Sequence, residues 1–265
     1  MPHIRVRDID IYHEVHGEGP RVLFISGTNG DLRNVPGLGT GPLERRFEVA
    51  HYDQRGLGRT TIPPGPYTMA DYADDAAGLL DALGWGSAHV VGVSFGGMVA
   101  QHLVLRHPQR VQRLVLACTS AGGAGGSSYD LLRLEGLPAD DRMRAWLPLL
   151  DSRNDTSTDP YSLAPGMGPI VAGRLARPAQ TGDAARGARL QLEARADHDV
   201  WDQLGTIAAP TLVIGGQFDE QASPGNLRNL HARIANSRLM LCDGGHLFMF
   251  QDSAAFPAIV DFLAE

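Results

Sequence analysis

The sequence contains no lysine, and all 23 of its basic residues are arginine. Without a lysine amine the chain cannot form a Schiff base or anchor pyridoxal phosphate, and it has neither a Walker-A lysine nor a Ser-Lys dyad. Arginine replaces lysine as the surface cation, but its guanidinium does not give up a proton at working pH. Amine-dependent chemistry is therefore excluded.

Cysteines and long apolar runs are also scarce. The two cysteines, Cys118 and Cys242, are too few for a disulfide framework or a structural zinc site. No pair of histidines or cysteines has metal-ligand spacing, so we expect no metal. No apolar run approaches the ~18 residues of a membrane span, and the first ten residues have no apolar signal core. We therefore expect a soluble, cytoplasmic protein with no membrane partner.

Length and charge narrow the class of protein further. A chain of 265 residues, 43% apolar and 20% charged, is long enough to bury a core without a disulfide or a metal to stabilise it. This length suits a single α/β domain. The net charge of −7 argues against a nucleic-acid partner. We expect a small-molecule substrate as the partner, while the oligomeric state is not indicated.

Two hydrophobic patterns predict the fold. Apolar and polar residues alternate on both sides of Arg7-Asp8, which is typical of a half-exposed antiparallel hairpin. Continuous apolar runs are typical of parallel strands buried on both faces. Such runs occupy residues 22–25, 88–91, 114–116 and 212–214, and two less regular runs occupy 47–52 and 239–241. Helical spacing recurs at 72–83, 98–106, 227–234 and 255–263. The pattern predicts a mostly parallel sheet of about eight strands, with helices on both faces.

The alternation of strands and helices breaks between residues 120 and 198. This stretch opens with a glycine- and serine-rich segment and is too long for a plain loop. It contains short helical candidates at 131–135, 142–150, 170–176 and 184–196. We predict a helical cap over residues 120–198, inserted into a core formed by residues 1–119 and 199–265.

The strongest functional motif is Gly92-Val93-Ser94-Phe95-Gly96, which follows a predicted buried strand and precedes a helix. In this context a serine sits on a sharp strand-to-helix turn, and small residues two positions before and after it avoid clashes. The turn would lift the Ser94 hydroxyl above the sheet, beside the helix N-terminus. The motif also fits a small-residue packing turn, but its context favours a nucleophile.

A serine nucleophile needs a base and an acid that orients the base. His246 follows the last predicted strand, so it lies at the same end of the sheet as Ser94. Asp219 follows another buried strand and is the candidate acid, with Glu220 as its neighbouring competitor. The order Ser94, Asp219, His246 is that of nucleophile, acid and base in α/β-hydrolases. We interpret the strand- and helix-borne histidines as surface or packing residues: His13, His16, His89, His102 and His107.

These residues, together with the segment Asp53-Gln54-Arg55-Gly56-Leu57-Gly58, resemble the α/β-hydrolase fold superfamily. The acid loop (residues 216–224) and the Gly245-His246 loop resemble those of the family, and the resemblance covers about residues 20–119 and 205–263. Within the superfamily the chain looks most similar to small bacterial esterases and the 3-oxoadipate enol-lactonase group. The resemblance implies the α/β-hydrolase fold, a Ser94–Asp219–His246 triad and no cofactor. A serine at position 94 argues against branches that use an aspartate nucleophile.

One departure from the family concerns the oxyanion hole. Where family members commonly carry His-Gly after the third strand, this chain has Ser26-Gly27-Thr28-Asn29. Because backbone N–H groups form the hole, the resemblance still implies donors at Thr28 and Phe95. Asn29 is a candidate substrate contact, and Met98, Phe248 and Met249 are candidate pocket walls.

The expected function is hydrolysis of a carboxylic ester or lactone of a small to medium, largely apolar substrate, through an acyl-enzyme on Ser94. Three alternatives stay open on the same residues. The site could cleave a C–C bond, serve a cofactorless tailoring reaction, or belong to a non-catalytic ligand receptor.

Overall fold

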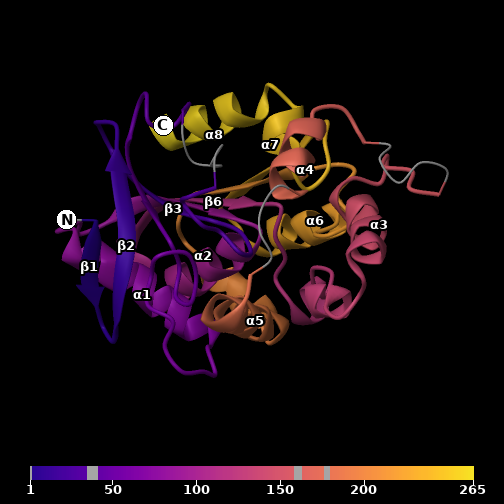
Figure 1. The fold of residues 1–265 in the computed structure, drawn as a ribbon. Helices are drawn as coiled ribbons and strands as arrows, with labels where there is room; N and C mark the ends of the chain where they lie inside the picture. Colours follow the sequence, from indigo (N-terminus) through magenta and orange to yellow (C-terminus); the bar gives the residue numbers. More distant parts are fainter. Residues whose placement is uncertain (1, 35–40, 158–162, 176–179) are drawn as a thin grey trace.

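The computed structural model describes residues 2–34, 41–157, 163–175 and 180–265 (Figure 1). Within these ranges, eight strands form one sheet in the order β1-β2-β4-β3-β5-β6-β7-β8. In chain order the strands are β1 (His3–Val6), β2 (Ile9–His16), β3 (Arg21–Ile25), β4 (Glu48–Tyr52), β5 (Ala88–Val93), β6 (Val111–Ala117), β7 (Thr211–Gly216) and β8 (Ser237–Cys242).

The sheet combines an antiparallel edge with a parallel body. Strands β1 and β2 form a hairpin in which Val6 pairs with Ile9, and β2 also runs antiparallel to β4. Every pairing from β4 to β8 is parallel. The prediction of a mostly parallel sheet of about eight strands with an N-terminal hairpin is confirmed. The carboxyl ends of β3 and β5–β8 therefore meet at one edge of the sheet.

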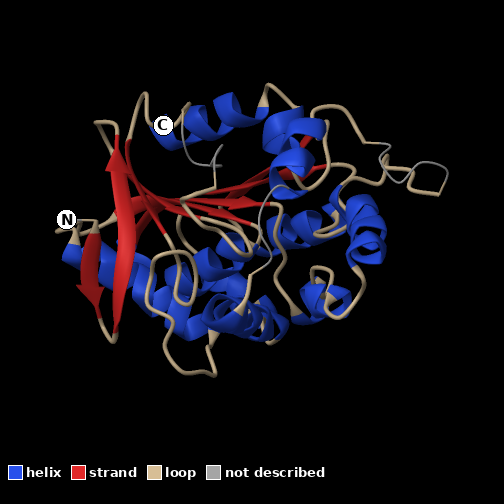
Figure 2. Cartoon of the chain, viewed as in Figure 1, coloured by secondary structure: helices blue, strands red, loops and turns tan. Residues whose placement is uncertain are grey.

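Helices cover both faces of this sheet (Figure 2). Helices α1 (Met69–Ala82), α2 (Phe95–Arg106) and α6 (Pro224–Arg233) contribute to one apolar cluster, whereas α8 (Ala255–Ala264) contributes to the cluster on the other face. A short helix, α7 (Phe248–Gln251), precedes α8 and has no counterpart among the predicted elements. The inner parallel strands β3 to β7 are largely buried, which explains their continuous apolar runs, whereas the edge strand β8 is buried only at Cys242.

The helical insert is the segment of residues 118–210 between β6 and β7, and its described residues form three α-helices. They are α3 (Ala139–Leu150), α4 (Gly168–Leu175) and α5 (Gly182–Ala196). Short 3₁₀ turns are η1 (Pro108–Arg110), before the insert, and η2 (Gly123–Gly125), η3 (Leu131–Leu134) and η4 (Trp201–Thr206), within it. The helices match the positions predicted from sequence, except that residue 176 lies outside the described residues. A small apolar cluster joins α3 to α4 through side chains that include Leu147 and Val171.

In the part of the chain that the structure describes, no helix has both the length and the apolar character needed to cross a membrane.

Candidate active site

Ser94 occupies the turn between β5 and α2. Its backbone has φ 55° and ψ −116°, a left-handed conformation that costs a non-glycine residue about 1–3 kcal/mol. The Ser94 N–H donates to the Ala117 carbonyl at 2.8 Å. The Thr119 hydroxyl donates to the Ser94 carbonyl at 2.9 Å. The neighbouring strand β6 therefore holds the strained turn in place.

Close packing explains the two glycines of the motif. A Cβ atom on Gly92 would overlap the carbonyl of Gly96, and a Cβ atom on Gly96 would overlap the carbonyl of Ile25. Both obstacles are backbone atoms, which cannot rotate away. Any larger residue at these positions would displace the turn and, with it, the Ser94 hydroxyl.

His246 and Asp219 lie beside Ser94 in the structure. His246 Nε2 is 3.0 Å from Ser94 Oγ, and His246 Nδ1 is 2.8 Å from Asp219 Oδ2. Side-chain burial is nearly complete, since Ser94, Asp219 and His246 are 7%, 0% and 8% exposed. Asp219 Oδ1 also accepts hydrogen bonds from the backbone N–H groups of Gln221 and Ala222, both at 2.8 Å. Because a carboxylate only accepts, the proton lies on Nδ1, and the unprotonated Nε2 is a hydrogen-bond acceptor.

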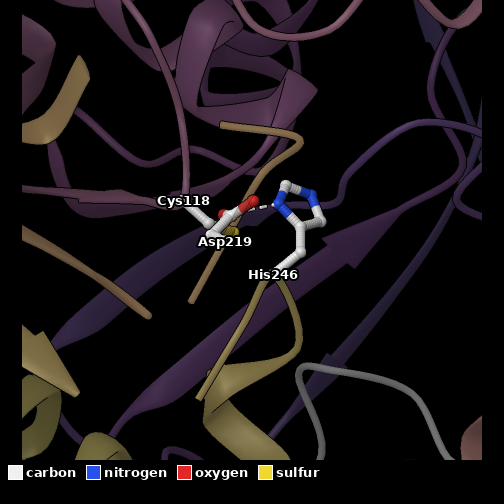
Figure 3. Close-up of side chains that lie close together, drawn as sticks. All are labelled: Cys118, Asp219 and His246. Atoms are coloured by element: carbon white, nitrogen blue, oxygen red, sulfur yellow. Dashed lines mark hydrogen bonds and ion pairs between the residues drawn. The ribbon is translucent and has the colours of Figure 1, made fainter. Parts of the chain in front are cut away.

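Cys118 lies next to the Asp219–His246 pair (Figure 3). One ligand-type atom from each of these three residues falls within 4.8 Å of the others. Burial, with a further contribution from the charge of Asp219, raises the pKa of the Cys118 thiol well above its ordinary value. A metal would need the thiolate and a free Nδ1, whereas Nδ1 already donates to Asp219. The cluster therefore fits a packed thiol beside an oriented imidazole better than a metal site.

Gln221 is a neighbour of His246 that the sequence pattern did not reveal. Its Nε2 lies 2.7 Å from His246 Nε2, the same atom that faces Ser94. Gln221 is 5% exposed, and its own backbone N–H helps to hold Asp219. Its place two residues after Asp219 is the only sequence signal for it, and this signal does not reveal which way the side chain points. Gln221 and Ser94 thus share one acceptor.

The competitor Glu220 lies in a different environment. It is exposed, and its backbone N–H donates to the Leu149 carbonyl at 3.1 Å. Asp219 is the carboxylate that the structure places against His246.

The loop after β3 lies against the Ser94 turn. A Cβ atom on Gly27 would be 3.4 Å from Ser94 Cβ. Gln54 Nε2 donates to the Ser26 carbonyl at 2.8 Å, and Asp53 Oδ1 accepts from the Leu32 N–H at 2.7 Å. The Asp53–Gly58 segment therefore anchors this loop, a role that its sequence did not reveal.

Thr28 and Asn29 end this loop close to the helical insert. Asn29 has φ 57°, and its N–H donates to Gln191 Oε1 at 2.8 Å. Thr28 Oγ1 and Asn29 Oδ1 are buried with no hydrogen-bond partner among the described residues. Within that same part of the chain, the turn, loop and capping bonds include none donated by the backbone N–H groups of Thr28 or Phe95.

The candidate pocket residues fall in two places. Met98 is 2% exposed and lines a cavity described below. Phe248 and Met249 belong to the apolar cluster on the α8 face, and the residues that line this cavity do not include them. Their contact with substrate stays a prediction.

The end of α3 is hydrogen-bonded to the loops that carry Asp219 and His246. The Ser152 N–H donates to the Phe218 carbonyl at 2.9 Å, and the His246 N–H donates to the Leu150 carbonyl. Residues 149–152, called here the α3 end segment, thus link the insert to both loops through backbone atoms. The positions of His246 and Asp219 depend on the insert as well as on the sheet.

A separate hollow of about 500 Å³ lies at the amino ends of β3, β5 and β6. Its lining includes Arg21, Ser87 and Gln112, none of which is buried. Ser94 lies at the opposite ends of these strands, so this hollow has no part in its chemistry.

The sheet order, the strained serine turn and the adjoining imidazole and carboxylate define a protein of the α/β-hydrolase class. A family model described as alpha/beta hydrolase fold matches residues 20–253. The chain therefore belongs to this family, and it is an α/β-hydrolase enzyme.

Particular relatives agree with this assignment. A poly(3-hydroxyalkanoate) depolymerase from Ectopseudomonas oleovorans is 32% identical over 231 residues, covering 84% of this chain and 77% of that protein. The 3-oxoadipate enol-lactonase 2 of Acinetobacter baylyi is 26% identical over 268 residues, covering 97% and 94%. The crystal structure of the enol-lactonase from Burkholderia xenovorans LB400 superposes with a TM-score of 0.80 at 26% identity, over 100% of both chains. The predicted resemblance to the α/β-hydrolase fold superfamily is confirmed.

Proposed function

We propose that the enzyme is a serine hydrolase that cleaves a carboxylic ester or lactone through an acyl-enzyme on Ser94. The observation that carries this proposal is the continuous contact from Ser94 Oγ to His246 Nε2 and from His246 Nδ1 to Asp219. A hydroxyl becomes a useful nucleophile only when a positioned base takes its proton. The similarity to an enol-lactonase and to a depolymerase supports this class of reaction.

In the first half-reaction, Ser94 Oγ attacks the carbonyl carbon while its proton moves to His246 Nε2. The tetrahedral intermediate collapses, the bond to the leaving oxygen breaks, and His246 returns the proton to that oxygen. Asp219 orients the ring and stabilises the imidazolium. In the second half-reaction, water attacks the acyl carbon, again with His246 as base. The acid is released, and Ser94 regains its proton.

In this proposal the backbone N–H groups of Thr28 and Phe95 form the oxyanion hole. The packing of Gly27 against Ser94 and the absence of acceptors for these two donors among the described residues support this role. Each such donor is worth about 3–4 kcal/mol in the transition state. We further propose that residues 120–198 act as a cap over the pocket, on a core of residues 1–119 and 199–265.

The Ser94→Ala variant tests the nucleophile. We expect kcat/KM for 4-nitrophenyl butyrate to fall by about 10³-fold or more, since the oxyanion donors alone supply only residual catalysis. A fluorophosphonate should add one adduct to Ser94 of the wild-type enzyme and none to the variant, as measured by mass spectrometry. Ser223→Ala, at the start of α6, is the matched control. Wild-type turnover by Ser94→Ala would contradict the proposal.

A comparison of substrates tests the bond that is cleaved. We expect turnover with a panel of lactones and esters and little with a panel of β-diketones. Faster cleavage of the diketones would instead assign the site to C–C bond hydrolysis.

A further inference from the structure

One face of α5 presents two buried polar side chains. Gln191 and Arg195 are four residues apart, which places them on the same side of the helix, and they are 0% and 5% exposed. Elsewhere on α5, Arg189 is 59% exposed and pairs with Glu193 at 2.9 Å. The contrast shows that Arg195 is turned inward, away from the solvated ion pairs.

Among the described residues, Arg195 has no counter-charge at hydrogen-bond distance. Its Nε and Nη2 atoms are buried and unpartnered, and no carboxylate of the described chain lies within ion-pair distance of it. Burial lowers the pKa of Arg195 to about 10, with Asp130 acting in the opposite direction, so the guanidinium is still charged at neutral pH. A buried cation without a partner is costly, and such costs are typical of sites that receive a ligand.

The carboxylate of Asp130 caps the short helix η3, which follows it in the chain. Asp130 Oδ1 accepts from the Leu132 N–H at 3.0 Å, and Asp130 Oδ2 lies 3.7 Å from Arg133. Asp130 therefore weakens the positive field near Arg195 without satisfying its N–H groups. This favours a singly charged ligand over a doubly charged one.

Arg195 lines a cavity of about 230 Å³. Its wall also contains Met98, Ser120, Ser128, Asp130 and His198. Since a water molecule in the liquid takes up about 30 Å³, the cavity has room for a carboxylate on a short chain. The wall is polar on the side of the serines and Arg195 and apolar at Met98.

The cavity adjoins the Ser94 turn through three links. Met98 lies one helical turn after Ser94 in α2. Ser120 follows Thr119, whose hydroxyl bonds the Ser94 carbonyl. Gln191, one turn before Arg195, accepts from the Asn29 N–H, and its own Nε2 is buried and unpartnered.

From these contacts we infer that Arg195 forms an anion subsite and that the substrate is an ester or lactone carrying a carboxylate, which the guanidinium binds. The planar guanidinium matches a carboxylate with two parallel hydrogen bonds. The inference rests on the proposed hydrolytic function of Ser94. It adds a charged group, at the Arg195 end of the pocket, to the largely apolar substrate expected from the sequence.

The experiment compares charged and neutral substrates of the same shape. The probes are the mono(4-nitrophenyl) esters of succinate, glutarate and adipate, each paired with the analogue whose free carboxylate is a carboxamide. We expect wild-type kcat/KM to favour at least one of the acids. In Arg195→Met this acid-to-amide ratio should fall about 10- to 100-fold, as expected for loss of a charged hydrogen-bonded pair. Arg195→Lys should retain part of the preference.

Arg189→Met is the matched control, because it removes an exposed charge from the same helix. Its acid-to-amide ratio should equal that of the wild type. The inference would be overturned if the acid-to-amide ratio of kcat/KM were the same in the wild type and Arg195→Met. It would also be overturned if this ratio fell as much in Arg189→Met as in Arg195→Met.

Binding to a Ser94→Ala background separates this inference from the proposed hydrolysis. Calorimetry should show tighter binding of the hemiester than of its amide, and Arg195→Met should abolish the difference. If no ester is hydrolysed but this Arg195-dependent binding persists, the subsite stands and the hydrolytic proposal fails. If neutral esters are hydrolysed without any Arg195-dependent preference, the hydrolytic proposal stands and the subsite is rejected.

Discussion

Single side chains at the site compete for a small number of hydrogen-bonding atoms. His246 Nδ1 bonds to Asp219, whereas His246 Nε2 faces both Ser94 and Gln221. Asp219 in turn divides its two oxygens between the imidazole and two backbone N–H groups. Substitutions that keep the shape but change a donor into an acceptor are therefore the sharpest tests at this scale.

Asp219→Asn should preserve the fold and lower kcat by about 10⁴-fold, because an amide no longer fixes the proton on His246 Nδ1. The measurement is kcat for an activated ester, with circular dichroism to check folding. Glu220→Gln makes the same chemical change one residue along the chain, on an exposed side chain. Equal losses from the two variants would contradict the assignment of Asp219.

Gln221→Glu should lower kcat/KM by about 10²-fold or more. A carboxylate 2.7 Å from His246 Nε2 would draw a proton onto that nitrogen and remove the acceptor for Ser94. Gln221→Leu, which has similar volume and no acceptor, should be much more active than Gln221→Glu. If the two variants lost activity equally, packing rather than hydrogen bonding would explain the effect.

Arg195→Met should raise the free energy of unfolding of the ligand-free enzyme by about 1 kcal/mol. The exchange replaces a buried, unpartnered cation with an apolar side chain of similar length. Urea unfolding measures the change, and Arg189→Met provides the reference for an exposed arginine. Destabilisation would mean that the folded protein satisfies the Arg195 charge.

At the scale of the elements, a histidine pair joins α2 to the end of α5. His102 Nε2 lies 3.2 Å from His198 Nδ1, and His198 Nε2 contacts the Ser120 carbonyl at 2.9 Å. Burial lowers the pKa of each ring from an ordinary 6.5 to about 4, with Arg106 adding to the effect at His102. For His198 the charges of His102 and Arg195 act in the same direction, opposed by the Ser120 carbonyl and Asp199.

This pair should make stability fall in mild acid. Above about pH 6.5 both rings are neutral whether the chain is folded or unfolded, so there is no penalty. Between about pH 6.5 and 4 the unfolded chain binds protons that the folded chain does not, so the free energy of unfolding decreases as pH falls. We expect urea midpoints to decline over this range, with a shallower decline in His102→Leu. An unchanged slope in the variant would contradict the assignment.

At the scale of the whole molecule, the sequence predicts what depends on local pattern. Continuous apolar runs such as residues 22–25 indicate strands buried on both faces, and the glycines around Ser94 indicate the turn. The start of α2 is the instructive exception. Helical periodicity begins only at Met98, because Gly96 and Gly97 have poor helix propensity, yet the helix starts at Phe95.

Contacts between distant residues were not predictable in this way. Asn29 and Gln191 are 162 positions apart, and their hydrogen bond depends on how the insert packs against the loop after β3. Arg195 carries no signal that separates it from the solvated arginines of the same helix. Its inward direction follows from the packing of α5, which a single sequence does not specify.

The backbone bonds of residues 149–152 constrain protein engineering. Exchanging the helices above the site for those of a relative is an obvious way to change specificity, and surface loops make convenient junctions. A graft that crosses residues 149–152 would remove backbone hydrogen bonds that hold the loops of Asp219 and His246. Chimeras should therefore retain this short stretch from the recipient and splice on either side of it.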